Sequence, residues 1–79
     1  MSIEEQTLDE EYNIMLESLS LRSKLPTFSI KEIEGELHHL LIYQGQDWGG
    51  RGEIKNAEIQ GQIYAYQIFI KRYKEKNNS

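Results

Sequence analysis

The chain contains no cysteine, which excludes disulfides and thiolate metal sites. It has only two histidines, which are adjacent, so a structural zinc site is not expected. No segment approaches the ~18 consecutive apolar residues of a membrane span. The acidic first residues do not form a secretory signal. We therefore expect a soluble cytoplasmic protein with no cofactor and no membrane partner.

Valine is also absent, and alternating polar and apolar residues are scarce, so a β-sheet is not expected. The length of 79 residues allows one small domain. A chain of this size buries only about 60% of the surface that its unfolded form exposes. Its core rarely contributes more than roughly 3–5 kcal/mol, and small domains often gain stability by association. We therefore expect a homo-oligomer.

Apolar residues recur at helical spacing in separate segments of the chain. The spacing predicts an all-α domain, in which an N-terminal helix precedes a helical hairpin. Three helices are expected, over residues 3–22, 30–44 and 52–74. A glycine-rich connector at 45–52 and a frayed tail at 75–79 complete the predicted single domain.

The signals for the second helix are the most complete. Pro26, the single proline, separates it from the first helix. Ser29 and Glu32 have the spacing of a capping box, and Phe28 and Ile33 that of a hydrophobic staple. These signals predict a helix start at residue 30.

The third predicted helix is apolar on two faces. One stripe comprises Ile59, Ile63, Tyr66, Ile70 and Tyr73, and the other comprises Ile54, Ala57, Gly61, Tyr64 and Ile68. A helix with so wide an apolar surface needs more than one neighbour, so we expect one stripe to pack inside the protomer and the other against a second copy. Small residues four apart allow close helix approach, and the predicted oligomer interface comprises Ala57, Gly61, Ala65 and Ile68. A crowded contact within one chain is the alternative.

No residue pattern indicates catalysis, and we expect a non-enzymatic protein. The serines do not lie in a nucleophile elbow, and the many carboxylates resemble solvated helix faces. His38 and His39 point about 100° apart on a helix and cannot share one ion. We expect both to flank the apolar face, one paired with Glu34 and the other at an interface. A few basic residues near the C-terminus of an acidic chain make nucleic-acid binding improbable.

Residues 45–52 contain four of the six glycines. They do not fit a phosphate-binding loop or a dinucleotide fingerprint. However, glycines let a ligand approach the backbone, a helix start attracts anions, an arginine can hold a phosphate, and a tryptophan can stack on a base. The predicted ligand site comprises Trp48, Gly49, Gly50, Arg51 and Gly52, closed by Tyr64 or Tyr66 from the same or a neighbouring chain. The alternative is a plain turn with Trp48 in the core.

The segment AEIQGQIYAY, residues 57–66, resembles the last-helix motif of the small helical anti-CBASS sponge proteins of phages. The residues that can be laid on that motif are Ala57, Glu58, Ile59, Gln60, Ile63 and Ala65. This resemblance covers about an eighth of the chain, and no ligand-contacting residue of the family maps onto it. It implies a phage or mobile-element accessory protein that oligomerises and sequesters nucleotide messengers.

Two functions therefore remain open. The first is sequestration of a nucleotide-like anion at the glycine-rich stretch. The second is a protein adaptor or inhibitor that uses its acidic first helix on a basic partner. Residues 1–21 carry six acidic side chains and no Lys or Arg, which favours steered association with a basic surface.

Overall fold

The computed structural model describes residues 2–45 and 52–77, and within these ranges the chain forms three α-helices and no strand. The helices are α1 (Ile3–Arg22), α2 (Ile30–Gly45) and α3 (Glu53–Asn77). The predicted all-α class is confirmed. The tail was predicted to fray from residue 75, but α3 continues to Asn77, and its last turn carries Lys74 and Lys76, which suit the negative end of a helix.

Local chemistry explains where the helices begin. The Glu5 amide donates to Ser2 Oγ at 3.1 Å, so Ser2 is the N-cap of α1. The Ile33 amide donates to the Ser29 carbonyl oxygen at 3.3 Å, which confirms the predicted start of α2. Gly52 precedes α3 with φ of 84°, a left-handed conformation that glycine adopts at no steric cost.

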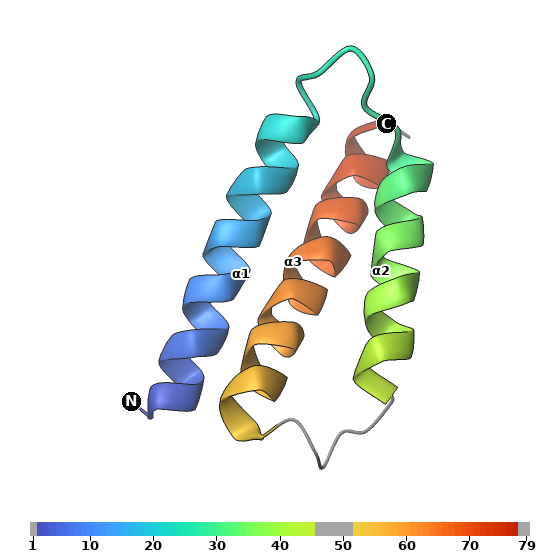
Figure 1. Cartoon of the computed structure of the whole chain (residues 1–79). Helices are drawn as coiled ribbons and strands as arrows, with labels where there is room; N and C mark the ends of the chain where they lie inside the picture. The colour runs from blue at the N-terminus through green and yellow to red at the C-terminus, as the bar shows by residue number, and fades with distance from the viewer. Residues whose placement is uncertain (1, 46–51, 78–79) are drawn as a thin grey trace.

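The three helices lie side by side, with α3 packed against both others (Figure 1). The chain ascends in α1, returns in α2 and ascends again in α3, so α1 and α3 run parallel while α2 runs antiparallel to them. The molecule measures 39 × 27 × 21 Å along its principal axes. Since α3 has a neighbour on two sides, its wide apolar surface is covered largely within one chain.

The contact between α1 and α3 depends on small residues of α3. Ala57, Gly61 and Ala65 are all buried within the chain. A Cβ atom on Gly61 would collide with the Leu8 carbonyl oxygen of α1, and would lie 3.2 Å from the Tyr12 backbone nitrogen. These three residues were predicted to contact a second copy, with a contact inside one chain as the alternative. The structure shows the alternative, because α1 of the same chain already covers them.

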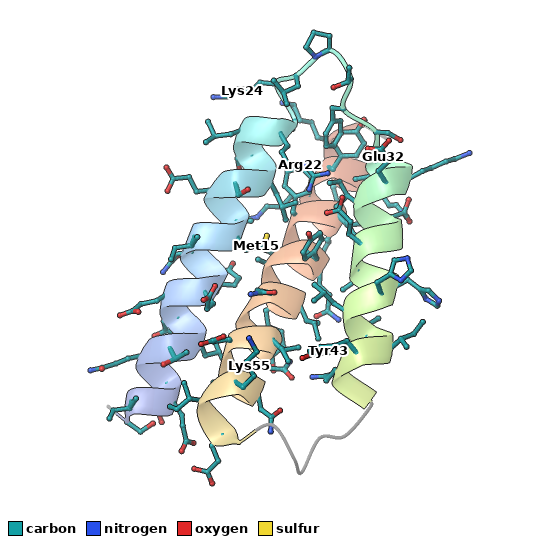
Figure 2. All side chains as sticks on the ribbon, viewed as in Figure 1. Met15, Arg22, Lys24, Glu32, Tyr43 and Lys55 are labelled. Atoms are coloured by element: carbon teal, nitrogen blue, oxygen red, sulfur yellow. The ribbon has the colours of Figure 1, made fainter. Side chains whose placement is uncertain are left out.

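The hydrophobic core lies where all three helices meet. Its buried centre is formed by Leu19 of α1, Ile33 of α2, and Tyr66 and Phe69 of α3. Partly buried side chains surround it: Met15, Leu16, Phe28, Ile30, Leu37, Leu40 and Ile70. Met15 points from α1 into this region (Figure 2). Phe28 and Ile33 belong to one cluster, as the predicted staple requires.

Candidate functional site

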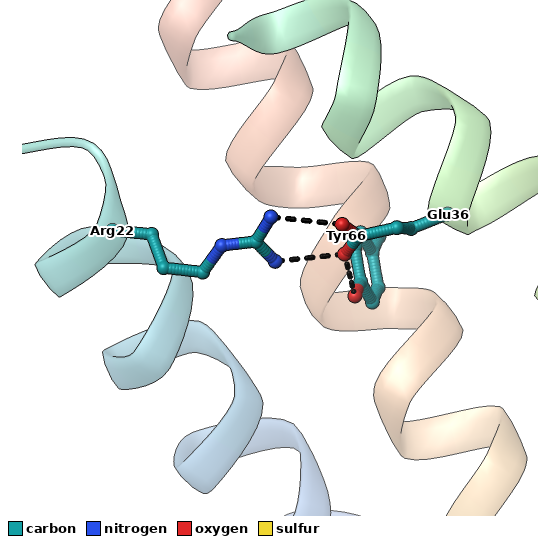
Figure 3. Close-up of polar contacts among 3 residues, drawn as sticks. All are labelled: Arg22, Glu36 and Tyr66. Carbon is teal, nitrogen blue, oxygen red and sulfur yellow. Dashed lines mark hydrogen bonds and ion pairs between the residues drawn. The ribbon is translucent and has the colours of Figure 1, made fainter. Parts of the chain in front are cut away.

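A polar network of three side chains joins the helices beside the core (Figure 3). Arg22 of α1 donates from Nη1 and Nη2 to the two carboxylate oxygens of Glu36 on α2, at 2.7 and 2.8 Å. Tyr66 of α3 donates its hydroxyl to Glu36 Oε1 at 2.7 Å. This bidentate geometry fixes the relative positions of α1 and α2, which otherwise share little contact.

The electrostatics of this network indicate a structural role. The Arg22 guanidinium holds the pKa of Glu36 below its ordinary value. Burial, and then the hydrogen bond to Glu36, raise the pKa of Tyr66 to about 12. General acid–base catalysis favours groups whose pKa lies near the working pH. Both shifts move away from neutrality, so the network gains no acid–base function from them.

The ligand pocket predicted from the sequence is only partly described. Trp48, Gly49, Gly50 and Arg51 lie outside the described residues, and Gly52 stands at the start of α3. Both aromatic residues proposed to close the pocket, Tyr64 and Tyr66, lie farther along that helix.

Tyr64 and Tyr66 have different environments and do not act as equivalents. Tyr66 is buried and bonded to Glu36, so it cannot close a pocket at the helix start. Tyr64 is 46% exposed on another side of α3. A helix rises 1.5 Å per residue, so Tyr64 lies roughly 18 Å along α3 from Gly52. Within one chain, neither tyrosine meets Gly52, because helical rise separates residues that are near in sequence.

The helix starts that flank the predicted pocket are acidic. Glu4 of α1 lies beside Glu53 of α3, and a hydrogen bond and charge repulsion from Glu53 raise the pKa of Glu4. Glu4, Glu5 and Glu53 stand in the first turns of two parallel helices, where they complement the positive helix ends. They also line one open hollow. This end of the molecule therefore disfavours an anionic ligand.

The histidines of α2 do not form the predicted pair with Glu34. Glu34 instead accepts a hydrogen bond from Lys74 Nζ of α3 at 3.0 Å. His38 and His39 are exposed, and their rings lie 6.3 Å apart. Among the described residues, no three His, Asp or Glu side chains gather closely enough to hold a metal ion.

An exposed apolar stripe runs along the outward side of α1. Ile3, Ile14, Leu21 and Leu25 are exposed by 70%, 62%, 58% and 55%. Residues seven or eleven apart lie on the same side of a helix, which aligns Ile3, Ile14 and Leu21. Leu25, which comes after the end of α1, belongs to the same surface. Together with Ile14 and Leu21 it lines one open hollow of about 420 Å³. We call these four residues the α1 stripe.

The α1 stripe was not predicted from the sequence because α1 carries apolar residues on two sides. The side that packs on α3 comprises Leu8, Tyr12, Met15 and Leu19, and its helical spacing is the stronger pattern. The seven-residue interval between Ile14 and Leu21, which is two helical turns, is the sequence pattern that indicates the second apolar side.

A second open surface follows the seam between α1 and α3. Two adjoining hollows, each of about 470 Å³, share Leu8 and Tyr64 and so form one continuous groove. Tyr12 and Ile68 add apolar surface at its middle. Ile68, one of the predicted interface residues, is half-buried here and lines the groove. We call this surface the α1–α3 groove.

Comparison with protein-family models, with curated proteins and with solved structures finds no match to the chain. None of the described helices is both long enough and apolar enough to cross a membrane. Function is therefore inferred from the surfaces of the described residues.

Proposed function

We propose that this protein is a non-enzymatic binding module that docks a basic, amphipathic helical segment of a partner protein on the α1 stripe. The observation that supports the proposal most strongly is the α1 stripe itself, in which four large apolar side chains remain more than half exposed. Its continuous part is Ile14, Leu21 and Leu25, which line one hollow, and contiguous exposed apolar surface of this kind marks interaction sites.

Burial of the stripe supplies a driving force. Complete burial of an Ile or Leu side chain is worth about 1.5–3 kcal/mol, so covering the exposed remainder contributes about 1 kcal/mol per residue. Ile14 and Leu21 are two turns apart and present adjacent anchors for a partner helix. The stripe can therefore provide a small apolar centre for an interface.

Charge around the stripe selects the partner. Glu17 lines the same hollow as Ile14 and Leu21, and Glu10 precedes Ile14 and Glu17 by four and seven residues on α1. Residues 1–21 contain no Lys or Arg, and Arg22, which also lines the hollow, is ion-paired with Glu36. Acidic residues around an apolar centre favour a partner with Lys or Arg beside its own apolar face, and they accelerate its association at low salt.

A labelled peptide of Leu and Lys, designed as an amphipathic helix, tests this proposal by fluorescence anisotropy. We expect it to bind, to weaken as salt rises, and to bind at least tenfold more weakly to an Ile14→Asp, Leu21→Asp double variant. Ile42→Asp is the matched control, because Ile42 is 46% exposed on α2, and it should bind as the wild type does. Circular dichroism verifies that each variant folds. Equal binding to the double variant and the wild type would refute the proposal, as would equal loss in the control.

Nucleotide sequestration, the other predicted function, rests on Trp48 and Arg51, which lie outside the described residues. The described residues at that end contribute Glu4 and Glu53, which repel an anion. No observation on the described surface favours this second function.

A further inference from the structure

A further hollow lies between the C-terminal ends of α1 and α3, which run parallel and end on the same side of the molecule (Figure 1). Its volume is about 370 Å³, which is in the range of small-molecule sites. Leu16 and Phe69 line it and also belong to the hydrophobic core and its surroundings. The Tyr73 ring stands beside them, with its centroid 6.4 Å from that of Phe69 and 5.5 Å from that of Phe28. The hollow therefore has an apolar wall that is anchored in the core.

The polar side chains around this wall supply positive charge and a hydroxyl donor. Arg72 is exposed, lines the hollow and makes no ion pair with another described residue. Of the two serines that line the hollow, Ser23 donates its hydroxyl to the Ser20 carbonyl oxygen at 2.6 Å. The Ser20 hydroxyl is thus the one that can donate to a ligand. Lys76 also lines the hollow but already has another contact, so Arg72 is the cation available to a ligand.

The charge of this hollow differs from that of the other two surfaces. None of the described residues that line it is acidic. By contrast, Glu17 lines the hollow of the α1 stripe, and Asp9 and Glu53 line the α1–α3 groove. In a chain with a formal net charge of −4, a hollow with cations and no carboxylate favours an anion.

The negative ends of the two helices are compensated beside this hollow. The carbonyl oxygens of residues 19–22 each accept a hydrogen bond from the chain, three from backbone amides and one from the Ser23 hydroxyl. Lys74 and Lys76 stand in the last turn of α3, where they offset the negative end of that helix. An anion in the hollow therefore meets no row of unbonded carbonyl oxygens at the end of α1.

We propose that this hollow binds an organic acid, in the form of a carboxylate attached to an apolar chain. The Arg72 guanidinium can hold both carboxylate oxygens at once, the Ser20 hydroxyl donates to one of them, and the chain lies against Leu16 and Phe69. One guanidinium balances one carboxylate, and the apolar wall keeps water from one side, which strengthens their attraction. The carboxylate can come from a free organic acid or from the C-terminus of a protein whose last residue is apolar.

This site is separate from the surface that receives the proposed basic partner. The residues that line the hollow are distinct from those of the α1 stripe and of the α1–α3 groove. The organic acid and the basic partner can therefore bind together. Either proposal can also fail without the other, because the variants that test them are different.

Amide chemical shifts of the full chain, titrated with acetate, butyrate and hexanoate at constant ionic strength, test the site. We expect the affinity to rise about two- to fourfold for each added methylene, since complete burial of one methylene corresponds to roughly fourfold. The largest changes should fall on Ser20, Arg72 and their neighbours. The uncharged analogue 1-hexanol should bind at least tenfold more weakly than hexanoate.

Three variants separate a built site from general attraction between charges. Arg72→Gln should weaken hexanoate binding at least tenfold, and Ser20→Ala should weaken it about threefold. Lys71→Gln is the matched control, because it removes one positive charge from the same part of α3 but lines the α1–α3 groove instead; it should change the affinity less than twofold. Circular dichroism verifies that each variant keeps its helices. Absence of hexanoate binding, equal affinity for acetate and hexanoate, or equal losses in Arg72→Gln and Lys71→Gln would each overturn the proposal.

Two peptides identify the source of the carboxylate. One is a neutral hexapeptide that ends in leucine with a free carboxylate, and the other is the same peptide with a C-terminal amide. If the free-carboxylate peptide binds more tightly than hexanoate, the site receives a protein C-terminus; if it does not, while hexanoate binds, the site receives a free organic acid. Either result supports the site, whereas an amide that binds as tightly as the carboxylate would overturn it.

Discussion

Replacement of Gly61 by alanine probes the contact on which the whole arrangement depends. Alanine in place of glycine inside an exposed helix normally stabilises it by about 0.5–1 kcal/mol. At Gly61 the new methyl group would collide with the Leu8 carbonyl oxygen, and would lie 3.2 Å from Glu11 Cβ and from the Tyr12 backbone nitrogen. Backbone atoms of α1 cannot rotate away as a side chain can, so α1 must shift outward.

The net magnitude follows from two opposed effects. Overpacking of a close contact typically costs about 1–3 kcal/mol, and the propensity gain offsets about 1 kcal/mol of that cost. Because the collision is with a backbone atom, the cost falls in the upper part of that range, about 2–3 kcal/mol, and we expect Gly61→Ala to lower the free energy of unfolding by about 1–2 kcal/mol. For a domain of this size each kcal/mol corresponds to roughly 4–8 °C in Tm, so the shift is measurable by thermal denaturation.

Gly35 of α2 is the matched control. It is exposed, and a Cβ atom built on it meets nothing within 4 Å. The same substitution should therefore stabilise the protein by about 0.5–1 kcal/mol through helix propensity alone. The two variants should move Tm in opposite directions. If Gly61→Ala stabilised the protein as Gly35→Ala does, α1 would not pack on α3 at this position, and the fold described above would be refuted.

Three further predictions concern the polar network and the glycine-rich stretch. Tyr66→Phe should cost about 1 kcal/mol in chemical denaturation, because it removes the hydrogen bond to Glu36; no loss would contradict the geometry of Figure 3. Arg22 lowers the pKa of Glu36 from 4.5, so ionised Glu36 stabilises the fold above that value, and this contribution is lost as pH falls through the lowered pKa. Glu36→Gln should flatten that part of the stability profile, and an unchanged profile would refute the assignment. Calorimetry with cyclic di- and trinucleotides tests the predicted ligand site: binding that Arg51→Ala abolishes would support it, and absence of heat with every nucleotide would exclude that site.

The sequence was sufficient to predict the helices because local signals determine them. Pro26 and the capping-box spacing of Ser29 and Glu32 predict one boundary, and the predicted starts agree with Ile3, Ile30 and Glu53 to within one residue. Even so, the Ser2–Glu5 spacing, which is itself a capping-box pattern, went unrecognised as the cap of α1. The end of α3 was also placed too early: the helix continues to Asn77, and Lys74 and Lys76 in its last turn suit the negative helix end.

The partners of each helix face could not be derived from periodicity. Small residues at Ala57, Gly61 and Ala65 indicate close approach but not which helix approaches, and here it is α1 of the same chain. Likewise, Tyr64 and Tyr66 are near in sequence, yet one faces the groove and the other the core. The Arg22 to Glu36 bond joins residues fourteen apart on different helices, a relation that only the tertiary fold creates.

The central claim is that the α1 stripe is the surface that receives a partner, and the most direct test is amide chemical-shift mapping during titration with the basic helical peptide. We predict that the largest changes fall on Ile14, Glu17, Leu21 and Leu25, with those of α2 unchanged. Changes concentrated on α2 or around Arg51, with none on the stripe, would contradict the claim.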